Sequence, residues 1–414
     1  MTLTQPMTTS DELKSLLQAI NGADEVFLDT EADSLHHYFE KICLLQFTIP
    51  GNDSMDASHF LVDPLAGLDL KPLFEVLKDK PLVLHGADYD LRMLRAGFDF
   101  TPAAIFDTML AARLAGHSAL GLDALVERYT GKQLDHGAQK ADWSQRPLPP
   151  RLLNYAVEDT RYLPLLAKKL REELSVLGRS EWHRQQCRQL IETSSVVRER
   201  DPDEIWRIKG SSKLDRQGLA ILRELWKWRD TEAQQWDRPP FMVCRNEQLL
   251  EWTDWAVAQV STLHKTGKLA DKDACATPFP THHSPSSSLP PKLPPRWRPS
   301  RVKSLRQALE RARKLSEGEW PDLPPRNKRP PYNPEFNARM DRLREARDVL
   351  ARKFNLNPSL LASGAMLAAV ASRNPKCPDD FGEIDRWLPW QTEALSPSFL
   401  QVLTMRAGHF ENLS

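Results

Sequence analysis

Short apolar runs alternate with helical patterns over the first half of the chain. Apolar runs bounded by turn-forming residues predict strands, and apolar residues spaced three and four apart predict amphipathic helices. Because strands come first in succession and then mix with helices, we expect an α/β domain built on a mixed sheet that helices cover. The predicted strands are residues 25–31, 42–49, 59–62 and 82–85, and the predicted helices are residues 68–77, 90–96, 108–114, 122–129 and 149–177.

The second half of the chain differs, because from about Asp203 onward the pattern is helical only. Residues 277–299 are rich in Pro and Ser, and such a composition indicates a linker that does not pack readily. A second helical block runs from Arg301 to about Leu403, interrupted by a Pro-rich loop near residues 321–334. We therefore expect an α/β domain over residues 1–195, an all-α helical bundle over residues 200–276, a linker over residues 277–299 and a second all-α domain over residues 300–414.

The composition, with 41% hydrophobic and 27% charged residues, is that of a soluble globular protein. At 414 residues the chain is too long for one ordinary core, so two or three domains are expected. No basic patch followed by an apolar stretch opens the chain, and its most apolar late stretch, residues 362–371, is too short to cross a membrane. The five cysteines form no CxxC pair, which favours a reducing cytosol over a disulfide framework or a zinc module. We expect a cytoplasmic monomer that contacts no membrane.

Charge is spread unevenly along the chain, although the formal net charge is zero. Residues 292–353 hold eighteen Lys and Arg against eight Asp and Glu, a balance of +10, so the remainder of the chain carries −10. A basic segment on an otherwise acidic chain suggests contact with phosphate groups. A solvated helix face with mixed charges explains the same composition equally well, so the charge alone leaves both interpretations open.

Two acidic residues interrupt a mostly apolar predicted strand. Asp29 and Glu31 are two residues apart, and side chains at that spacing point to the same side of a strand. Desolvating two carboxylates together is costly unless a cation meets them. A hard divalent ion such as Mg²⁺ or Mn²⁺, which prefers oxygen ligands, is the simplest such cation.

Two further places supply groups of the same chemical kind. The apolar run over residues 81–84 leads into a glycine-containing turn and then a helix. This arrangement would place an acid at the edge of the sheet, and either Asp88 or Asp90 could be that acid. Asp88 is equally suited to cap the helix. Tyr155 and Asp159 are four residues apart in a predicted helix and therefore stack on one face. A carboxylate there can hold a metal ion while the phenol orients a water molecule, and two-metal phosphodiester cleavage needs both parts.

The order of these three motifs resembles the ribonuclease D family, which belongs to the DEDD exonucleases, in the subclass with Tyr in the third motif. The resemblance implies a ribonuclease-H-like mixed sheet. The family pattern places its acid immediately before the Leu of HGADYDL, which favours Asp90 over Asp88. The matching segments are DTEADSLHHYFEKICLLQ (residues 29–46), HGADYDLRML (residues 85–94) and YAVEDTRYL (residues 155–163).

Carried over by position, the resemblance implies a complete set of catalytic groups. It makes Tyr155 the residue that positions the attacking water. It also implies two divalent metal ions, Mg²⁺ or Mn²⁺. Their ligands would be Asp29, Glu31, Asp90 and Asp159.

A second resemblance covers IWRIKGSSKLDRQGLAILRELWKWRDTEAQQWDRPP (residues 205–240), which is similar to the HRDC domain, a small helical bundle whose surface Lys and Arg help hold nucleic acid. Residues 300–414 would then form a second, diverged HRDC-like domain. Asp107 is interpreted as a helix cap rather than a metal ligand. Packed loops and solvated surfaces explain the candidate nucleic-acid contacts equally well. Those candidates are His37, Tyr38, Lys140, Arg146, Lys209 and Lys213.

The resemblance implies a metal-dependent 3′→5′ exoribonuclease that trims RNA 3′ ends, those of transfer RNA precursors included, and releases nucleoside 5′-monophosphates. The alternative of a 3′→5′ DNA exonuclease of the same superfamily stays open, because a metal site binds the phosphate group and does not distinguish ribose from deoxyribose. A non-catalytic nucleic-acid-binding protein is the third hypothesis. It predicts erosion of the acidic set, yet the sequence retains all four carboxylates and the tyrosine.

Overall fold

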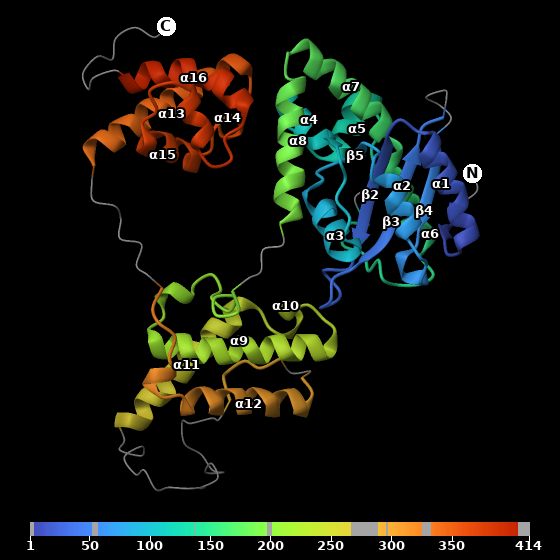
Figure 1. Ribbon diagram of the computed structural model, residues 1–414. Helices are drawn as coiled ribbons and strands as arrows, with labels where there is room; N and C mark the ends of the chain where they lie inside the picture. The colour runs from blue at the N-terminus through green and yellow to red at the C-terminus, as the bar shows by residue number, and fades with distance from the viewer. Residues whose placement is uncertain are drawn as a thin grey trace. The chain divides into compact units, whose positions relative to one another are not determined.

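The structure is a computed structural model that describes residues 4–51, 57–135, 137–196, 201–265, 289–294, 297–324 and 333–404. The chain forms two compact units. The first unit comprises residues 1–33, 41–197 and 329–414, and the second comprises residues 34–40 and 198–328. Figure 1 labels most of the helices and strands of both units.

The first unit contains a mixed sheet of six strands, and Figure 1 shows helices packed beside it. Its strands are β1 (Pro6–Met7), β2 (Val26–Ala32), β3 (Ile42–Ile49), β4 (Ser58–Val62), β5 (Leu82–Leu84) and β6 (Ile105–Asp107), in the order β1-β4-β3-β2-β5-β6. β3 pairs antiparallel with β2 and β4, whereas β5 pairs parallel with β2 and β6, and β1 pairs parallel with β4. The prediction of a mixed sheet is confirmed.

Helices cover both faces of this sheet. They are α1 (Ser10–Gly22), α2 (Lys71–Leu77), α3 (Asp88–Phe98), α4 (Thr108–Ala115), α5 (Leu122–Thr130), α6 (Pro150–Arg161), α7 (Leu163–Val176) and α8 (Ser180–Ser195), with the short 3₁₀ helix η1 (Pro64–Ala66). All eight residues of β3 are buried, so neither face of this strand is open to solvent. Leu16 of α1 shares a core with Leu45 of β3, and Leu153 and Ala156 of α6 share another with Leu44.

The predicted helix over residues 149–177 is two helices, because Pro164 interrupts it. α6 ends at Arg161 and α7 begins at Leu163. Proline has no backbone N–H and disfavours helical backbone in the residue before it, but it is tolerated in the first turn of a new helix. The break leaves Asp159 in the last turn of α6.

The described part of the second unit is all-α, as predicted. It contains α9 (Arg216–Trp236), α10 (Pro240–Val243), α11 (Asn246–Lys265) and α12 (Pro299–Lys314), with the 3₁₀ helices η2 (Ser211–Lys213) and η3 (Glu317–Glu319). Leu222 and Leu225 of α9 and Leu249 of α11 share one core with Leu305 and Leu309 of α12. α12 therefore packs with α9 rather than with the helices that follow it.

The helices after α12 belong to the first unit and enclose a core of their own. They are α13 (Pro334–Phe354), α14 (Pro358–Leu361), α15 (Gly364–Arg373) and α16 (Pro389–Thr404), with the 3₁₀ helix η4 (Pro378–Glu383). Trp390 of α16 stacks on Trp182 of α8, with 4.4 Å between the ring centroids, which joins this core to the sheet-bearing part. In the described part of the chain, no helix combines the length and the apolar character needed to span a bilayer.

These packing relations bear on the predicted domain boundaries. Residues 300–414 are predicted to form one domain, whereas the structure changes from one compact unit to the other between α12 and α13. The physical reason is the apolar face of α12, which completes the core of α9 and α11. Most of the predicted linker, residues 277–288, lies outside the described residues, so the boundaries stay a prediction.

Candidate active site

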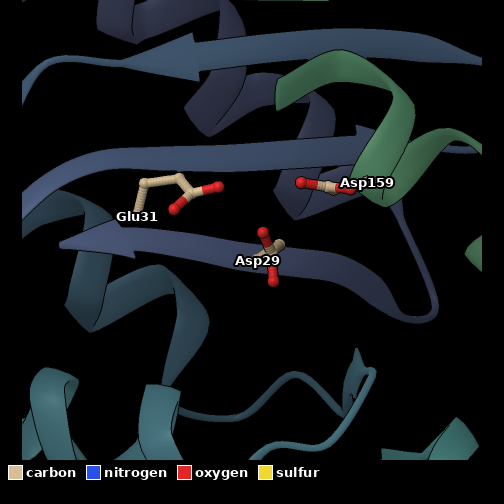
Figure 2. Close-up of side chains that lie close together, drawn as sticks. All are labelled: Asp29, Glu31 and Asp159. Carbon is tan, nitrogen blue, oxygen red and sulfur yellow. The ribbon is translucent and has the colours of Figure 1, made fainter. Parts of the chain in front are cut away.

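Strand β2 carries two of the candidate side chains. Val26, Phe27 and Leu28 are almost completely buried and anchor β2 between β3 and β5. Asp29 and Glu31 follow on alternate positions, so their side chains lie on one side of the strand, as their spacing predicts. Figure 2 shows both carboxylates on the side from which Asp159 approaches.

The last turn of α6 supplies the third acid. Ligand oxygens of Asp29, Glu31 and Asp159 all lie within 4.8 Å of one another, and Figure 2 shows the carboxylates of Glu31 and Asp159 facing each other. α6 reaches this position because its apolar residues, Leu153 and Ala156 among them, pack on the face of β3, the neighbour of β2. Tertiary packing therefore assembles a cluster whose members are far apart in the sequence.

The fourth acid, Asp90, lies in the first turn of α3 and lines the same cavity. It is only 6% exposed, and the hydroxyl of Thr30 donates a 2.6 Å hydrogen bond to its carboxylate. Asp88 is exposed and forms an ion pair with Arg92 at 2.6 Å. The alternative of Asp88 as helix cap is wrong, because Ala87 occupies the cap position and Asp88 is the first helical residue.

Asp107 holds the turn that leads into α3. It caps α4 by accepting hydrogen bonds from the backbone N–H groups of Met109 and Leu110, which confirms the prediction of a cap. The same carboxylate accepts hydrogen bonds from the backbone N–H groups of Gly86 and Ala87, at 3.1 and 2.9 Å. Gly86 adopts a left-handed backbone, with φ of 73°. Asp107 thus positions the helix that carries the fourth acid, a role that sequence reasoning missed.

Tyr155 lies one turn before Asp159 on α6 and lines the cavity with it. Interaction with the Tyr155 hydroxyl opposes the rise in the pKa of Asp159. Burial, followed by the charges of Asp159, Glu31 and Asp29, raises the pKa of the Tyr155 hydroxyl above its ordinary value. The phenol therefore stays protonated at neutral pH.

Burial and mutual repulsion raise the pKa of the clustered carboxyls. Burial, then the charges of Asp90, Asp159 and Glu31, holds the pKa of Asp29 well above its usual range. Burial, then the charges of Asp159 and Asp90, raises the pKa of Glu31 to about 9. Burial likewise raises the pKa of Asp159 to about 8 and that of Asp90 to about 6.

These electrostatics fit a site for divalent cations. Without a cation, the cluster holds protons because its ionised carboxylates are desolvated and repel one another. A bound cation relieves that repulsion and favours the ionised forms. The donor atoms are all oxygens, a set that suits hard cations such as Mg²⁺ and Mn²⁺ better than zinc, which is usually bound through nitrogen and sulfur.

The cavity above the carboxylates has a volume of about 390 Å³. Its other walls combine apolar side chains, Met109, Leu122 and Leu134, with His85 and Gln139. A larger cavity of about 1130 Å³ lies where α4 and α8 meet α13–α15, but the residues that line it form no carboxylate cluster. The smaller cavity is therefore the candidate active site.

Two of the candidate nucleic-acid contacts, His37 and Tyr38, lie in the short segment of residues 34–40 that belongs to the second unit. The His37 ring lies 2.6 Å from the carboxylate of Asp237, which also accepts a hydrogen bond from the backbone N–H of Tyr38. The Tyr38 hydroxyl donates to Asp230 at 3.0 Å. These contacts tie the segment to α9, which supports the alternative that these side chains have a structural role.

The other four candidates are Arg146 and three lysines. The guanidinium of Arg146 donates two hydrogen bonds to the carboxylate of Asp63, at 2.5 and 2.6 Å, and further hydrogen bonds to backbone carbonyls. These hydrogen bonds stabilise the fold. Lys140, Lys209 and Lys213 are exposed. Lys140 directly follows Gln139, which lines the cavity. All of these assignments as nucleic-acid contacts stay predictions.

Comparison with known proteins gives the same class of enzyme. A family model described as a 3′-5′ exonuclease matches residues 4–175, and the model of the HRDC domain matches residues 218–252 and 336–403. Ribonuclease D of Escherichia coli, a solved structure, matches with a TM-score of 0.65 at 23% identity over 97% of this chain and 98% of that chain, which shows the same fold. Fold and site together define a 3′-5′ exonuclease.

Sequence relatives identify the family. Ribonuclease D of Jannaschia sp. is 34% identical over 273 residues, which cover 65% of this chain and 69% of the relative. Ribonuclease D of Bartonella henselae is 26% identical over 416 residues, 98% of this chain and 91% of the relative. Among the first three relatives, the chain spans 62–69% of their length. The chain belongs to the ribonuclease D family, whose members are 3′-5′ exoribonucleases.

Proposed function

We propose that the chain removes nucleotides one at a time from RNA 3′ ends and releases nucleoside 5′-monophosphates. Asp29, Glu31, Asp90 and Asp159 would hold two divalent cations, Mg²⁺ or Mn²⁺. The observation that carries this proposal is the assembly of three carboxylates within 4.8 Å of one another, in a cavity that Asp90 and Tyr155 also line.

The chain's own residues have separable roles in this reaction. Bound divalent cations supply charge stabilisation at the phosphate and lower the pKa of a bound water. The Tyr155 hydroxyl interacts with Asp159, and its oxygen can accept a hydrogen bond from the attacking water and orient it. Because the pKa of Tyr155 is raised, the phenol positions water as a neutral group and does not act as a base.

Three observations support RNA 3′ ends as the substrate. The family resemblance implies RNA, and transfer RNA precursors in particular. The Escherichia coli relative is described as an exoribonuclease involved in structured RNA processing. Part of the second unit, residues 218–252, and the helices over residues 336–403 match the HRDC domain model. We place the enzyme in the cytoplasm as a monomer as part of the same proposal.

The test uses purified full chain with 3′-tailed RNA and the matching DNA, each with Mg²⁺, with Mn²⁺ and with EDTA. Stepwise shortening of RNA from its 3′ end, lost in EDTA, is the expected result. Shortening of DNA alone would replace the proposal with a DNA exonuclease. Binding without shortening of either substrate would favour a non-catalytic protein.

Two pairs of variants sharpen this test. Asp90→Asn should abolish hydrolysis while RNA binding persists, whereas Asp88→Asn, two residues away and exposed, should leave hydrolysis unchanged. Equal activity of both variants would remove Asp90 from the site. Tyr155→Phe should slow hydrolysis by about 10²-fold, because the attacking water is no longer held in place, while metal binding is retained. A fully active variant would remove Tyr155 from the mechanism.

A further inference from the structure

The basic segment seen in the sequence, residues 292–353, is divided between the two compact units. Its first part forms α12, which packs in the second unit, and its last part forms α13, which belongs to the first. The two helices also use their cations differently. This difference shows which part of the segment is available to a partner.

The cations of α13 are mostly engaged within the protein. The guanidinium of Arg339 donates to the carbonyl of Ala371 at 2.8 Å. Arg344 pairs with Asp341 at 3.0 Å, and Arg347 pairs with the neighbouring Asp348. These bonds compensate much of the positive charge of this helix locally.

On α12, three cations lie together on the exposed face. Lys303, Arg306 and Lys314 are exposed, and within the described residues no hydrogen bond or ion pair engages their side chains. Their spacing places them on one face of the helix, opposite the buried Leu305 and Leu309. The row from Lys303 to Lys314 is about 16 Å long at 1.5 Å per residue.

The remaining charges of α12 do not cancel this row. Glu310 lies on the same face, one turn from both Arg306 and Lys314, and offsets one of the three positive charges. Arg313 is half-buried over the ring of Trp255. Arg301 and Arg311 pair with the acids of α9, Glu232 and Glu224. The face therefore keeps a net positive charge after each internal pair is counted.

We propose that this face of α12 binds the phosphate backbone of a double-stranded RNA stem, upstream of the 3′ end that is trimmed. The inference rests on the proposed function. Single-stranded nucleic acid is usually held by cations together with exposed aromatic platforms, and α12 contains no aromatic residue. A rigid straight row of cations without aromatics matches a regular backbone, as in a duplex recognised by its shape and phosphates.

This surface lies outside both segments that match the HRDC domain model, which end at residue 252 and begin again at residue 336. It is also distinct from Lys209 and Lys213, the contacts that the family resemblance implies. Truncation at residue 300 is unsuited to test it, because Leu305 and Leu309 would leave the core of the second unit. The test must remove charge and keep the helix.

The experiment compares the full chain with the triple variant Lys303→Gln, Arg306→Gln, Lys314→Gln. Gln has nearly the helix propensity of Lys and Arg, and circular dichroism confirms that each variant is folded. Binding of a 3′-tailed RNA hairpin is measured by fluorescence anisotropy in EDTA over a series of NaCl concentrations. The matched control removes three exposed cations of α13, with Arg344→Gln, Arg352→Gln and Lys353→Gln.

In the α12 variant, the plot of log affinity against log salt should be shallower by about 2 to 3, because about 0.7–0.9 of slope is lost with each phosphate contact. The α13 control should keep the slope of the wild type. An unchanged slope in the α12 variant, or an equal loss in both variants, would overturn the proposal. So would an equal loss on single-stranded RNA of the same length.

A second readout separates this inference from the proposed function. Hydrolysis of a short unstructured oligoribonucleotide with Mg²⁺ should be the same in the α12 variant and the wild type, because such a substrate has no stem. If the wild type fails to hydrolyse it, the nuclease proposal is wrong, while binding in EDTA still tests α12. If only the variant fails, α12 acts on catalysis and the stem-binding proposal is overturned.

Discussion

The Thr30 hydroxyl donates a 2.6 Å hydrogen bond to Asp90 and lowers its pKa against the larger effect of burial. Thr30→Val keeps the side-chain shape and removes the donor, so the pKa of Asp90 should rise further. Metal affinity should then fall about 10- to 100-fold, as for other groups that orient a metal ligand. Calorimetric titration with Mn²⁺ measures this change in affinity.

The control is Thr253→Val, which removes a buried hydroxyl bonded to the carbonyl of Leu249. This variant should bind Mn²⁺ like the wild type. Equal affinity of all three proteins would contradict the role of Thr30.

The raised pKa values of Glu31 and Asp159, about 9 and about 8, predict a pH dependence of metal stabilisation. Above the ordinary carboxyl pKa the unfolded chain has released these protons, while the metal-free folded protein keeps them. The free energy of unfolding of the metal-free protein should therefore fall as pH rises from about 5 to about 8. Cation binding needs the ionised carboxylates, so affinity should rise over the same range.

Thermal melts with and without Mg²⁺ measure this effect. The increase in Tm on adding Mg²⁺ should be larger near pH 8 than near pH 6. Glu31→Gln, which has no proton to release at that position, should reduce the dependence. An increase in Tm that is the same at both pH values would mean that the clustered carboxyls do not bind the ion.

At the scale of secondary-structure elements, Asp107 joins two of them, because its carboxylate accepts backbone hydrogen bonds from the start of α4 and from the turn before α3. Asp107→Ala should lower the free energy of unfolding by about 2 to 4 kcal/mol, since a cap is lost and buried N–H groups are left without acceptors. It should also slow hydrolysis, because the helix that carries Asp90 loses its anchor.

Urea denaturation and single-turnover hydrolysis together check this prediction. Asp215→Ala removes the N-cap of α9, which accepts a hydrogen bond from Gly218. That control should cost about 1 kcal/mol and leave hydrolysis of a short oligonucleotide unchanged. If Asp107→Ala were destabilised yet hydrolysed RNA at the rate of the wild type, Asp107 would stabilise the fold without positioning Asp90.

The elements of the site were predictable where local spacing decides geometry. Alternation along β2 places Asp29 and Glu31 on one side, and the four-residue spacing on α6 places Tyr155 over Asp159. Strands β1 and β6, of two and three residues, are too short to show a period of apolar residues, and α1 and α8 were not recognised. The missed contacts of Thr30 are tertiary, and its place between two acids was the only local signal.

At the scale of the whole molecule, the compact units divide the chain differently from its order in sequence, because residues 329–414 return to the unit that contains the sheet. Arg179, which is 6% exposed, ties the two parts of that unit together. Its guanidinium donates to the carbonyls of Leu114 in α4 and Phe354 in α13, at 2.6 and 2.5 Å. One guanidinium thereby donates hydrogen bonds to carbonyl groups at the C-terminal ends of both helices, which have no partner within the helix. No pattern in the sequence links these three positions, which is why the predicted domain boundaries treated residues 300–414 as independent.

Two compact units with separate cores should unfold in two calorimetric transitions. Arg179→Leu should lower only the transition of the unit that contains the sheet, because it leaves the carbonyls of Leu114 and Phe354 without a donor. Leu249→Ala, in the core of the second unit, should lower only the other transition, by about 2 to 5 kcal/mol. Mg²⁺ should raise the first transition and leave the second unchanged, because the carboxylates all lie in the first unit. A single transition that both variants and Mg²⁺ shift together would show that the units unfold as one cooperative body.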